Sequence, residues 1–291
     1  MKNIELLAID TQYDFCDIPD KYKARQFDSV SGNEIIIEPA LPVPGAWDDS
    51  IRLASFIKNA GHLISRITIT LDTHQQYDIA HPLFWKNKLG VHPSPFTSIS
   101  NESIRNGEWI PLDSSKLNYV LEYTKELELG GLYQLFIWPE HCIVGTVGHN
   151  VIYPIMKEIL DWENKYVSRV NYLSKGHNPY TEHYGGFQAE YPLPNDNTTQ
   201  LNSKLIEKFQ KADLILLTGQ ALSHCVASTV RQLADNFGED NIKKLVLLRD
   251  TTSSVTGFEK NGDDFVKEME SRGMKVVNTT DIKFTKTDLI F

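Results

Sequence analysis

Cysteine is scarce in this chain, and long hydrophobic runs are missing from it. Its 291 residues include three cysteines, Cys16, Cys142 and Cys225, an odd number without a Cys-x-x-Cys pair. A disulfide framework and a cysteine-only zinc site are therefore not expected, and a reducing cytoplasm is the expected location. No apolar run approaches the length of a membrane span, and the first ten residues are typical of a strand rather than of a signal peptide.

Positive charge is also in deficit. The chain has 29 Lys and Arg against 38 Asp and Glu, a net charge of −9. This argues against a nucleic acid or an anionic membrane as the main partner, and it is compatible with a neutral small molecule or a cation as ligand. The sequence contains neither Gly-x-Gly-x-x-Gly after its first strand nor a Gly-Lys-Ser/Thr phosphate loop. Nucleotide binding thereby loses its main support.

Short apolar runs alternate with segments of helical spacing. Because the runs are rich in Ile, Leu and Val, we expect strands buried on both faces and a three-layer α/β/α sandwich on a mostly parallel, doubly wound sheet. The strands are expected at 4–9, 62–71, 166–173, 214–217, 244–248 and 274–277. The helices are expected at 46–60, 118–127, 151–162, 202–209 and 258–271, and from 225 onward, with a small hairpin around 34–37.

The connection at about 77–135 is long for a link between core elements. Such a length is typical of a lid, an oligomer contact or a partly mobile insertion, and these alternatives stay open. We expect one domain spanning residues 1–291 with this segment inserted into it.

Reactive side chains follow four of the expected strands. Asp10 follows the first strand, Asp72 and His74 the second, Lys175 the next, and Cys225 lies at the first turn of the helix after the strand at 214–217. Each has an ordinary explanation by itself, as a turn aspartate, a surface lysine or a small buried cysteine. Because the carboxyl ends of parallel strands share one edge of a sheet, we expect these groups to lie in one crevice.

Asp10, Lys175 and Cys225 form a coherent set for nucleophilic catalysis. Lys175 lowers the pKa of the thiol electrostatically, and Asp10 accepts the thiol proton and later gives it to a leaving amine. A helix N-terminus at Cys225 offers backbone amides to an oxyanion.

Asp72 and His74 suggest a metal site. Residues two apart in an extended segment point to the same side, and a carboxylate with an imidazole suits zinc, iron or manganese. His141, in a loop rich in Pro and Gly, is a candidate third ligand, although a packed histidine is the ordinary explanation for a single His.

Five motifs, in order along residues 6 to about 250, resemble the isochorismatase-like cysteine hydrolases, and among them the nicotinamidases (pyrazinamidases). The tryptophan-loop motif is the specific one, since it separates nicotinamidases from metal-free relatives. The motifs are Asp10-x-Gln12-x-Asp14-Phe15, Asp72-x-His74, Trp138-Pro-x-His141-Cys142-x-x-Gly145-Thr146, Lys175-Gly176 with Tyr184-x-x-Phe187, and Gly219-x-Ala221-x-x-x-Cys225-Val226.

This resemblance implies that Asp10, Lys175 and Cys225 are a catalytic triad. It implies that a divalent metal, usually zinc, is held by Asp72, His74 and His141, with waters completing the shell. His81 lies near the position of a further histidine that some members use as a ligand. Residues 219–222 match a segment with a cis peptide beside the oxyanion hole. The substrate contacts it implies are Phe15, Trp138, Tyr184, Ala221 and Leu222.

The implied function is hydrolysis of nicotinamide to nicotinate and ammonia through a Cys225 thioester. Whether the chain forms a homo-oligomer stays open. The alternatives are an amidase for another small amide, a metallohydrolase in which metal-bound water attacks, and an inactive binding protein. Two departures bear on the substrate, because Gly185 stands where many members have Ser and Ser223 where an acidic residue is common.

Overall fold

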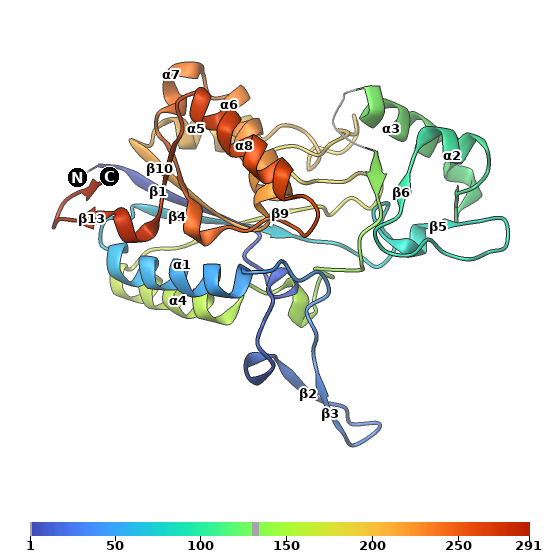
Figure 1. The fold of residues 1–291 in the computed structure, drawn as a ribbon, viewed down its shortest axis with the longest axis horizontal. Helices are drawn as coiled ribbons and strands as arrows, with labels where there is room; N and C mark the ends of the chain where they lie inside the picture. Colours follow the sequence, from blue (N-terminus) through green and yellow to red (C-terminus); the bar gives the residue numbers. More distant parts are fainter. Residues whose placement is uncertain (1, 130–133) are drawn as a thin grey trace.

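The centre of the fold is a six-stranded sheet in which every pairing is parallel. The structure, a computed structural model, describes residues 2–129 and 134–291. The strand order is β12-β11-β10-β1-β4-β9 (Figure 1), which confirms the expected doubly wound sheet. The strands are β1 (Ile4–Ile9), β4 (Arg66–Asp72), β9 (Asn171–Lys175), β10 (Leu214–Gly219), β11 (Leu245–Leu248) and β12 (Lys275–Val277).

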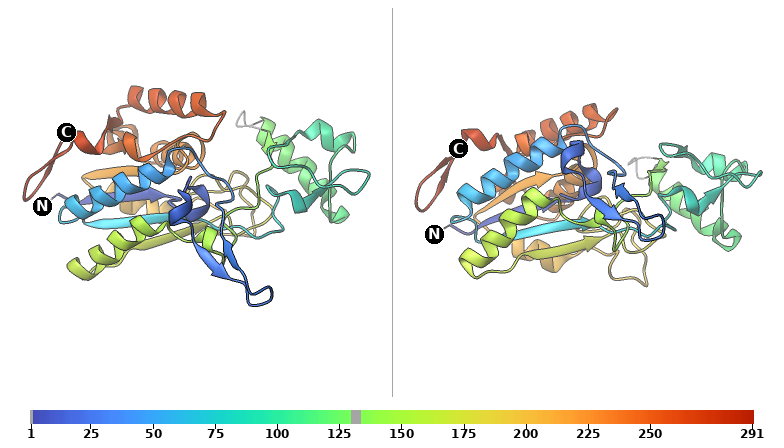
Figure 2. Two further views of the ribbon diagram at one scale, coloured as in Figure 1. Left: turned by 60° about the horizontal axis from the view of Figure 1, so that its bottom comes forward. Right: turned by 90° about the horizontal axis from the view of Figure 1, so that it is seen from below.

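Helices cover both faces of this sheet, so the three-layer expectation is confirmed (Figures 1 and 2). One face carries α1 (Ala46–Ala60) and α4 (Tyr153–Tyr166). The other carries α5 (Ser203–Gln210), α6 (Ala227–Asp235) and α8 (Glu259–Ser271). Strand β1 shows the alternation directly. Leu6 and Ala8 enter the core under α1 and α4, while Leu7 and Ile9 enter the core of the opposite face.

Two strand predictions were wrong at their starts. Helix α4 continues to Tyr166 and ends at Val167 in a left-handed conformation, so β9 begins only at Asn171. Strand β9 lies at the edge of the sheet and is mostly exposed, so its apolar pattern is weak. Leu63 and Ile64 are buried because they pack under the core from a turn, not from a strand, and β4 starts at Arg66.

The expected insertion folds into a compact unit beyond the carboxyl edge of the sheet (Figure 1). Its described part, residues 77–129 and 134–135, has its own buried core around Phe84, Trp85 and Tyr123. The elements are β5 (Trp85–Lys86), β6 (Ser98–Ile99), α2 (Asn101–Arg105), β7 (Ile110–Pro111), α3 (Leu117–Leu129) and β8 (Leu135–Phe136). The unit therefore lies next to the carboxyl edge of the sheet, where the reactive side chains were expected.

Three smaller elements complete the fold. A hairpin of β2 (Arg25–Phe27) and β3 (Glu34–Ile36) projects from the body, as expected around residues 34–37 (Figure 1). Helix α7 (Glu239–Ile242) precedes β11, and β13 (Lys283–Phe284) pairs with β14 (Leu289–Ile290). Across the described ranges, none of the helices has the length and apolar character needed to span a bilayer.

Candidate active site

Asp10, Lys175 and Cys225 meet at the carboxyl edge of the sheet, as expected. Asp10 is the first residue after β1, in a left-handed conformation with φ of 45°, and Thr70 donates a hydrogen bond to its Oδ1 at 2.5 Å. The Lys175 Nζ lies 2.9 Å from Asp10 Oδ2 and 3.6 Å from Cys225 Sγ. All three side chains are buried.

Lys175 is a buried cation held by anions and a carbonyl. Its Nζ lies 3.0 Å from Asp72 Oδ1 and donates to the His183 carbonyl at 2.9 Å, in addition to its contact with Asp10. Burial alone would lower the pKa of Lys175, but the carboxylates of Asp10 and Asp72 hold this pKa well above its ordinary value. The ammonium therefore stays charged.

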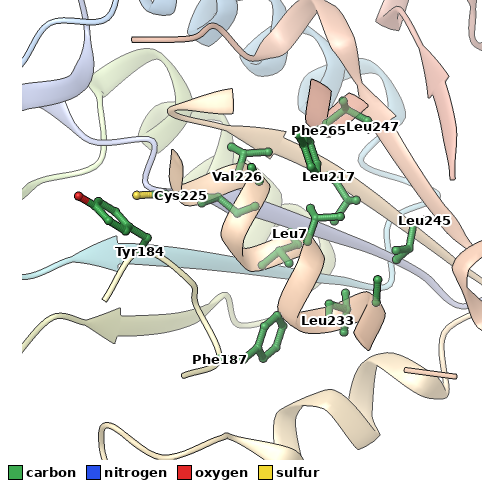
Figure 3. Packing of buried hydrophobic residues seen from close by; sticks show 14 of the residues in the cluster. Leu7, Tyr184, Phe187, Leu217, Cys225, Val226, Leu233, Leu245, Leu247 and Phe265 are labelled. Atoms are coloured by element: carbon green, nitrogen blue, oxygen red, sulfur yellow. The ribbon is translucent and has the colours of Figure 1, made fainter. Parts of the chain in front are cut away.

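Cys225 lies on a wide helical turn rather than in the first turn of an α-helix. A single π-helical turn, Leu222–Val226, precedes α6, and Cys225 is its fourth residue. Figure 3 shows its sulfur at the edge of the packed core, turned toward Tyr184. Burial raises the pKa of the Cys225 thiol well above its ordinary value, and Lys175 opposes this only in part. The expected electrostatic activation is outweighed, and the resting group is a thiol that needs a base.

Asp10 is suited to be that base. Burial raises the pKa of Asp10, and Lys175 opposes the shift. Its carboxylate and the Cys225 sulfur, together with Asp72, lie within 4.8 Å of one another. A carboxyl with a raised pKa can accept a proton from the thiol and return it in a later step.

The residues expected to bind a metal also come together. Asp72 Oδ2 lies 3.2 Å from His74 Nε2 and 3.4 Å from His141 Nε2. The ligand atoms of His74, His81 and His141 lie within 4.8 Å of one another. His81 lies near the position of a histidine that some family members use as a ligand. Its distance from His74 and His141 makes it a fourth candidate ligand here.

The chemistry of this donor set fits a divalent cation. His74 Nε2 and His141 Nε2 are buried and both face Asp72 Oδ2, while the other oxygen of Asp72 is paired with Lys175. Two imidazole nitrogens and one carboxylate oxygen in contact are ligand atoms that a divalent cation binds. Burial would lower the pKa of His74, but Asp72 and Asp78 hold it well above its ordinary value, so a bound cation would take the place of a proton. Burial and the two neighbouring histidines lower the pKa of His81 to about 2, which keeps its ring neutral.

Two buried carboxylates were not identified from the sequence, Asp78 beside His74 and Glu182 in the lining of a small pocket. Asp78 accepts from the His74 ring, with Oδ2 3.0 Å from Nδ1, and so orients the other ring nitrogen toward the cluster. Glu182 is buried, its Oε2 makes no hydrogen bond within the described ranges, and burial raises its pKa to about 7. Glu182 lies in an irregular segment, so no periodic pattern predicts where its side chain points. The one indication in the sequence that it lies near the site is its position seven residues after Lys175.

A small pocket leads to Cys225, and four of the five expected substrate contacts line it. These four are Phe15, Trp138, Tyr184 and Ala221. The remaining lining residues are Leu41, Asp72, His141, Glu182, His224, Cys225 and Val255. The sequence therefore identified the aromatic walls but missed Leu41, His224 and Val255.

Leu222 is placed elsewhere. Its side chain is fully buried in the core beside Gly262, and its amide donates to the Ser253 carbonyl at 2.8 Å. The cis peptide bond implied at residues 219–222 lies between Gln220 and Ala221. The Ala221 amide donates to no acceptor in the described part of the chain, so it is available to an oxyanion.

The two positions that depart from the family pattern, Gly185 and Ser223, each have a specific contact in the structure. A Cβ atom at Gly185 would lie 2.2 Å from the Gln232 side chain. That side chain accepts from the amides of Phe187 and Gln188 and donates to the Gln188 carbonyl. Ser223 accepts from the Val255 amide at 3.1 Å, which ties the nucleophile turn to the segment opposite it.

Replacing Gly185 with Ser is expected to lower the free energy of unfolding by about 1–3 kcal/mol, because the new side chain displaces Gln232 from its hydrogen bonds. Urea unfolding of Gly185→Ser, Gln232→Ala and the double variant measures this effect. Once Gln232 is removed, the serine should cost little more. Fully additive losses would show that Gly185 is required for a reason other than Gln232.

No protein-family profile matches the chain. A curated nicotinamidase of Saccharomyces cerevisiae (strain ATCC 204508 / S288c) is 23% identical over 239 residues, covering 82% of this chain and 91% of that protein. The resemblance to nicotinamidases that the motifs indicated is thereby confirmed over 239 residues of the chain.

Two solved structures share the fold. The yeast nicotinamidase matches with a TM-score of 0.62 at 20% identity, covering 94% of this chain and 99% of that one. A Pyrococcus horikoshii pyrazinamidase in complex with zinc matches with a TM-score of 0.53 at 17% identity, covering 95% and 99%. The chain therefore has the isochorismatase-like hydrolase fold that the motifs implied.

Proposed function

We propose that this chain is a nicotinamidase, an amidohydrolase that converts nicotinamide to nicotinate and ammonia. The observation that carries the proposal is the contact of a buried thiol, a carboxyl and a lysine, Cys225, Asp10 and Lys175, at the end of an aromatic pocket. The relationship to the yeast nicotinamidase in sequence and fold supports the same activity. Because nicotinate is the product, we propose a role in pyridine-nucleotide salvage.

Acylation begins at Cys225. Asp10 takes the thiol proton as Sγ attacks the carboxamide carbon, and the substrate oxygen becomes an oxyanion that the Ala221 amide faces. The carbon–nitrogen bond then breaks, and Asp10 gives its proton to the departing nitrogen, which leaves as ammonia. Lys175 stays charged throughout and compensates the negative charge that moves between the thiol and Asp10.

Deacylation uses the same residues. Asp10 takes one proton from a water that attacks the thioester carbon, the carbon–sulfur bond breaks, and the Cys225 thiolate receives that proton from Asp10. The second proton of the water stays on the new carboxyl group and is lost to solvent, so the product leaves as nicotinate and the thiol is restored. The aromatic walls Phe15 and Trp138 orient the ring while this proceeds.

A divalent metal, with zinc as the proposed ion, would be held by Asp72, His74 and His141, joined by His81. The cluster lies on the wall of the pocket that contains Asp72 and His141. When bound, such an ion supplies a Lewis-acid contact that orients the pyridine nitrogen. The zinc complex of the Pyrococcus horikoshii pyrazinamidase supports this choice of ion.

Replacing Asp78 with Asn is expected to weaken metal binding by about 10–100-fold, because the His74 ring loses the carboxylate that orients it. Zinc affinity is measured by competition with a chromophoric chelator. Asp48→Asn, on the exposed surface of α1, is the matched control and should leave the affinity unchanged. Equal affinities for the Asp78 variant and the native chain would show that His74 is not a ligand.

Ammonia release across nicotinamide, pyrazinamide and a carbamoyl amide tests the proposed activity directly. Nicotinamide should give the highest kcat/KM. Preferred hydrolysis of the carbamoyl amide would favour the alternative of an amidase for another small amide.

We further propose that residues 1–291 act as one domain, with the 77–135 unit forming the outer part of the site. Three free, buried cysteines support a cytoplasmic location. The partner we propose is a small neutral amide rather than a nucleic acid or a membrane, and a homo-oligomer is compatible with this assignment.

A further inference from the structure

A second, larger cavity lies outside the pocket that leads to Cys225. It has a volume of about 610 Å³ and is formed where the insertion strands β6 and β8 face the start of α8, helix α6 and the loop after Tyr184. We call it the outer groove. Its volume falls within the range of about 300–1,000 Å³ typical of small-molecule sites.

The outer groove and the inner pocket share one wall. Trp138, Tyr184 and His224 line both. The Trp138 ring donates to the Tyr184 hydroxyl at 2.7 Å, and the His224 ring packs edge-on against Phe258, 4.7 Å between ring centroids. The two cavities therefore adjoin, and a molecule that occupied both would extend from the groove to the nucleophile.

The groove offers aromatic surface without free positive charge. Phe136 and Phe258 contribute rings to the lining. Arg231 is paired with Glu268 at 2.6 Å, and Asp235 with Arg272 at 2.8 Å. An anionic group such as a phosphate therefore finds no uncompensated cation among the groove residues.

The rest of the lining is mostly neutral, and its one further charged residue is the acidic Glu190, which also disfavours an anionic ligand. The side chains of Gln188, Ser228 and Asn261 line the groove and make no hydrogen bond within residues 2–129 and 134–291. Such groups suit hydroxyl, ether or amide functions of a ligand. The chemistry of the lining is that of a site for an uncharged molecule with an aromatic part and polar substituents.

We propose that the outer groove binds the distal part of an extended, uncharged aromatic carboxamide whose carboxamide group reaches Cys225. The inference rests on the proposed function and specifies its substrate class as ring-substituted nicotinamides in addition to nicotinamide itself. The aromatic wall of Trp138, Tyr184 and His224 lies between the two parts of such a substrate.

The test compares kcat/KM for nicotinamide with kcat/KM for a panel of primary nicotinamides that carry an uncharged phenyl or hydroxyalkyl group at each ring carbon in turn. The native chain should hydrolyse at least one member of the panel. Ser228→Trp fills the groove and should lower the ratio of the two kcat/KM values, extended over plain amide, by at least about tenfold. Ser55→Trp, on the exposed face of α1, is the matched control and should leave the ratio unchanged.

Each other outcome overturns the inference. An unchanged ratio in Ser228→Trp would show that the groove is only an access route. Hydrolysis of nicotinamide without any of the panel would remove the groove from the substrate site and leave the proposed function intact. Failure of nicotinamide itself would overturn both. Asn261→Trp, at an exposed position on the opposite wall, gives a second test if Ser228→Trp does not fold, as judged by circular dichroism.

Discussion

Replacing Cys225 with Ala is expected to reduce kcat for ammonia release by about 10⁴-fold or more, because no thioester can form without the sulfur. The change removes one buried sulfur beside Lys175 and leaves the charged groups of the site in place. Ammonia release measures the effect. Cys16→Ala is the matched control, since Cys16 is also buried and free but packs against Ser50 on the opposite face of the sheet.

A covalent adduct separates this mechanism from its main rival. Rapid quenching of the native enzyme with nicotinamide should yield a chain whose mass is increased by one nicotinoyl group, and Cys225→Ala should not acquire it. Full turnover by Cys225→Ala would instead support attack by metal-bound water, with the cysteine as a bystander. Because burial raises the pKa of the Cys225 thiol, formation of the nicotinoyl adduct should depend on Asp10 as the base.

Replacing Lys175 with Met is expected to lower the free energy of unfolding by about 3–5 kcal/mol and to abolish activity, because two buried carboxylates lose their shared cation. Urea unfolding at neutral pH measures the stability. Lys157→Met is the matched control. Lys157 pairs with Glu158 and Asp161 on the surface, so its loss should leave the stability nearly unchanged.

The loss of stability in Lys175→Met is expected to depend on pH. In the native chain, burial opposes the ionised form of Asp72, but His74 and Lys175 hold the pKa of Asp72 well below its ordinary value, so its stabilising contribution is lost only at low pH. Without Lys175, both carboxylates take up protons at higher pH, which relieves the buried charge. The stability difference between the native chain and Lys175→Met should therefore shrink as the pH falls from 7 to 5.

A double variant tests whether unpaired buried charge is the cause of the lost stability. Asp10→Asn removes one of the two charges, so Lys175→Met with Asp10→Asn should be more stable than Lys175→Met alone. A loss that is equal at all pH values and additive in the double variant would contradict the electrostatic explanation. It would point to packing of the lysine chain instead.

The triad could be predicted because local patterns locate strand ends. Asp10 and Cys225 each follow a run of apolar residues, and parallel strands place such positions along one edge of the sheet. The start of β9 was wrong, since an edge strand exposes residues that a central strand would bury. Lys175 was nevertheless placed correctly, because its location depends on where β9 ends and not on where it begins.

The remaining parts of the site depend on contacts between distant, irregular segments. Glu182 and His224 reach the pocket through loop and π-turn geometry that has no periodic signal. Leu222 faces the core rather than the pocket because that turn is wider than an α-helix, a feature that spacing does not report.

The sequence by itself determined the fold class and located Asp72, His74 and Cys225 at or beyond the carboxyl ends of strands, since hydrophobic patterning shows where the strands end. Only the tertiary structure decided how these groups are charged and what surrounds them. Burial of the Cys225 thiol outweighs the cation beside it, and Gly185 is matched to Gln232, which lies 47 residues away in the chain. Such outcomes depend on packing between elements, because the pKa of a group and the space around it are set by neighbours in three dimensions.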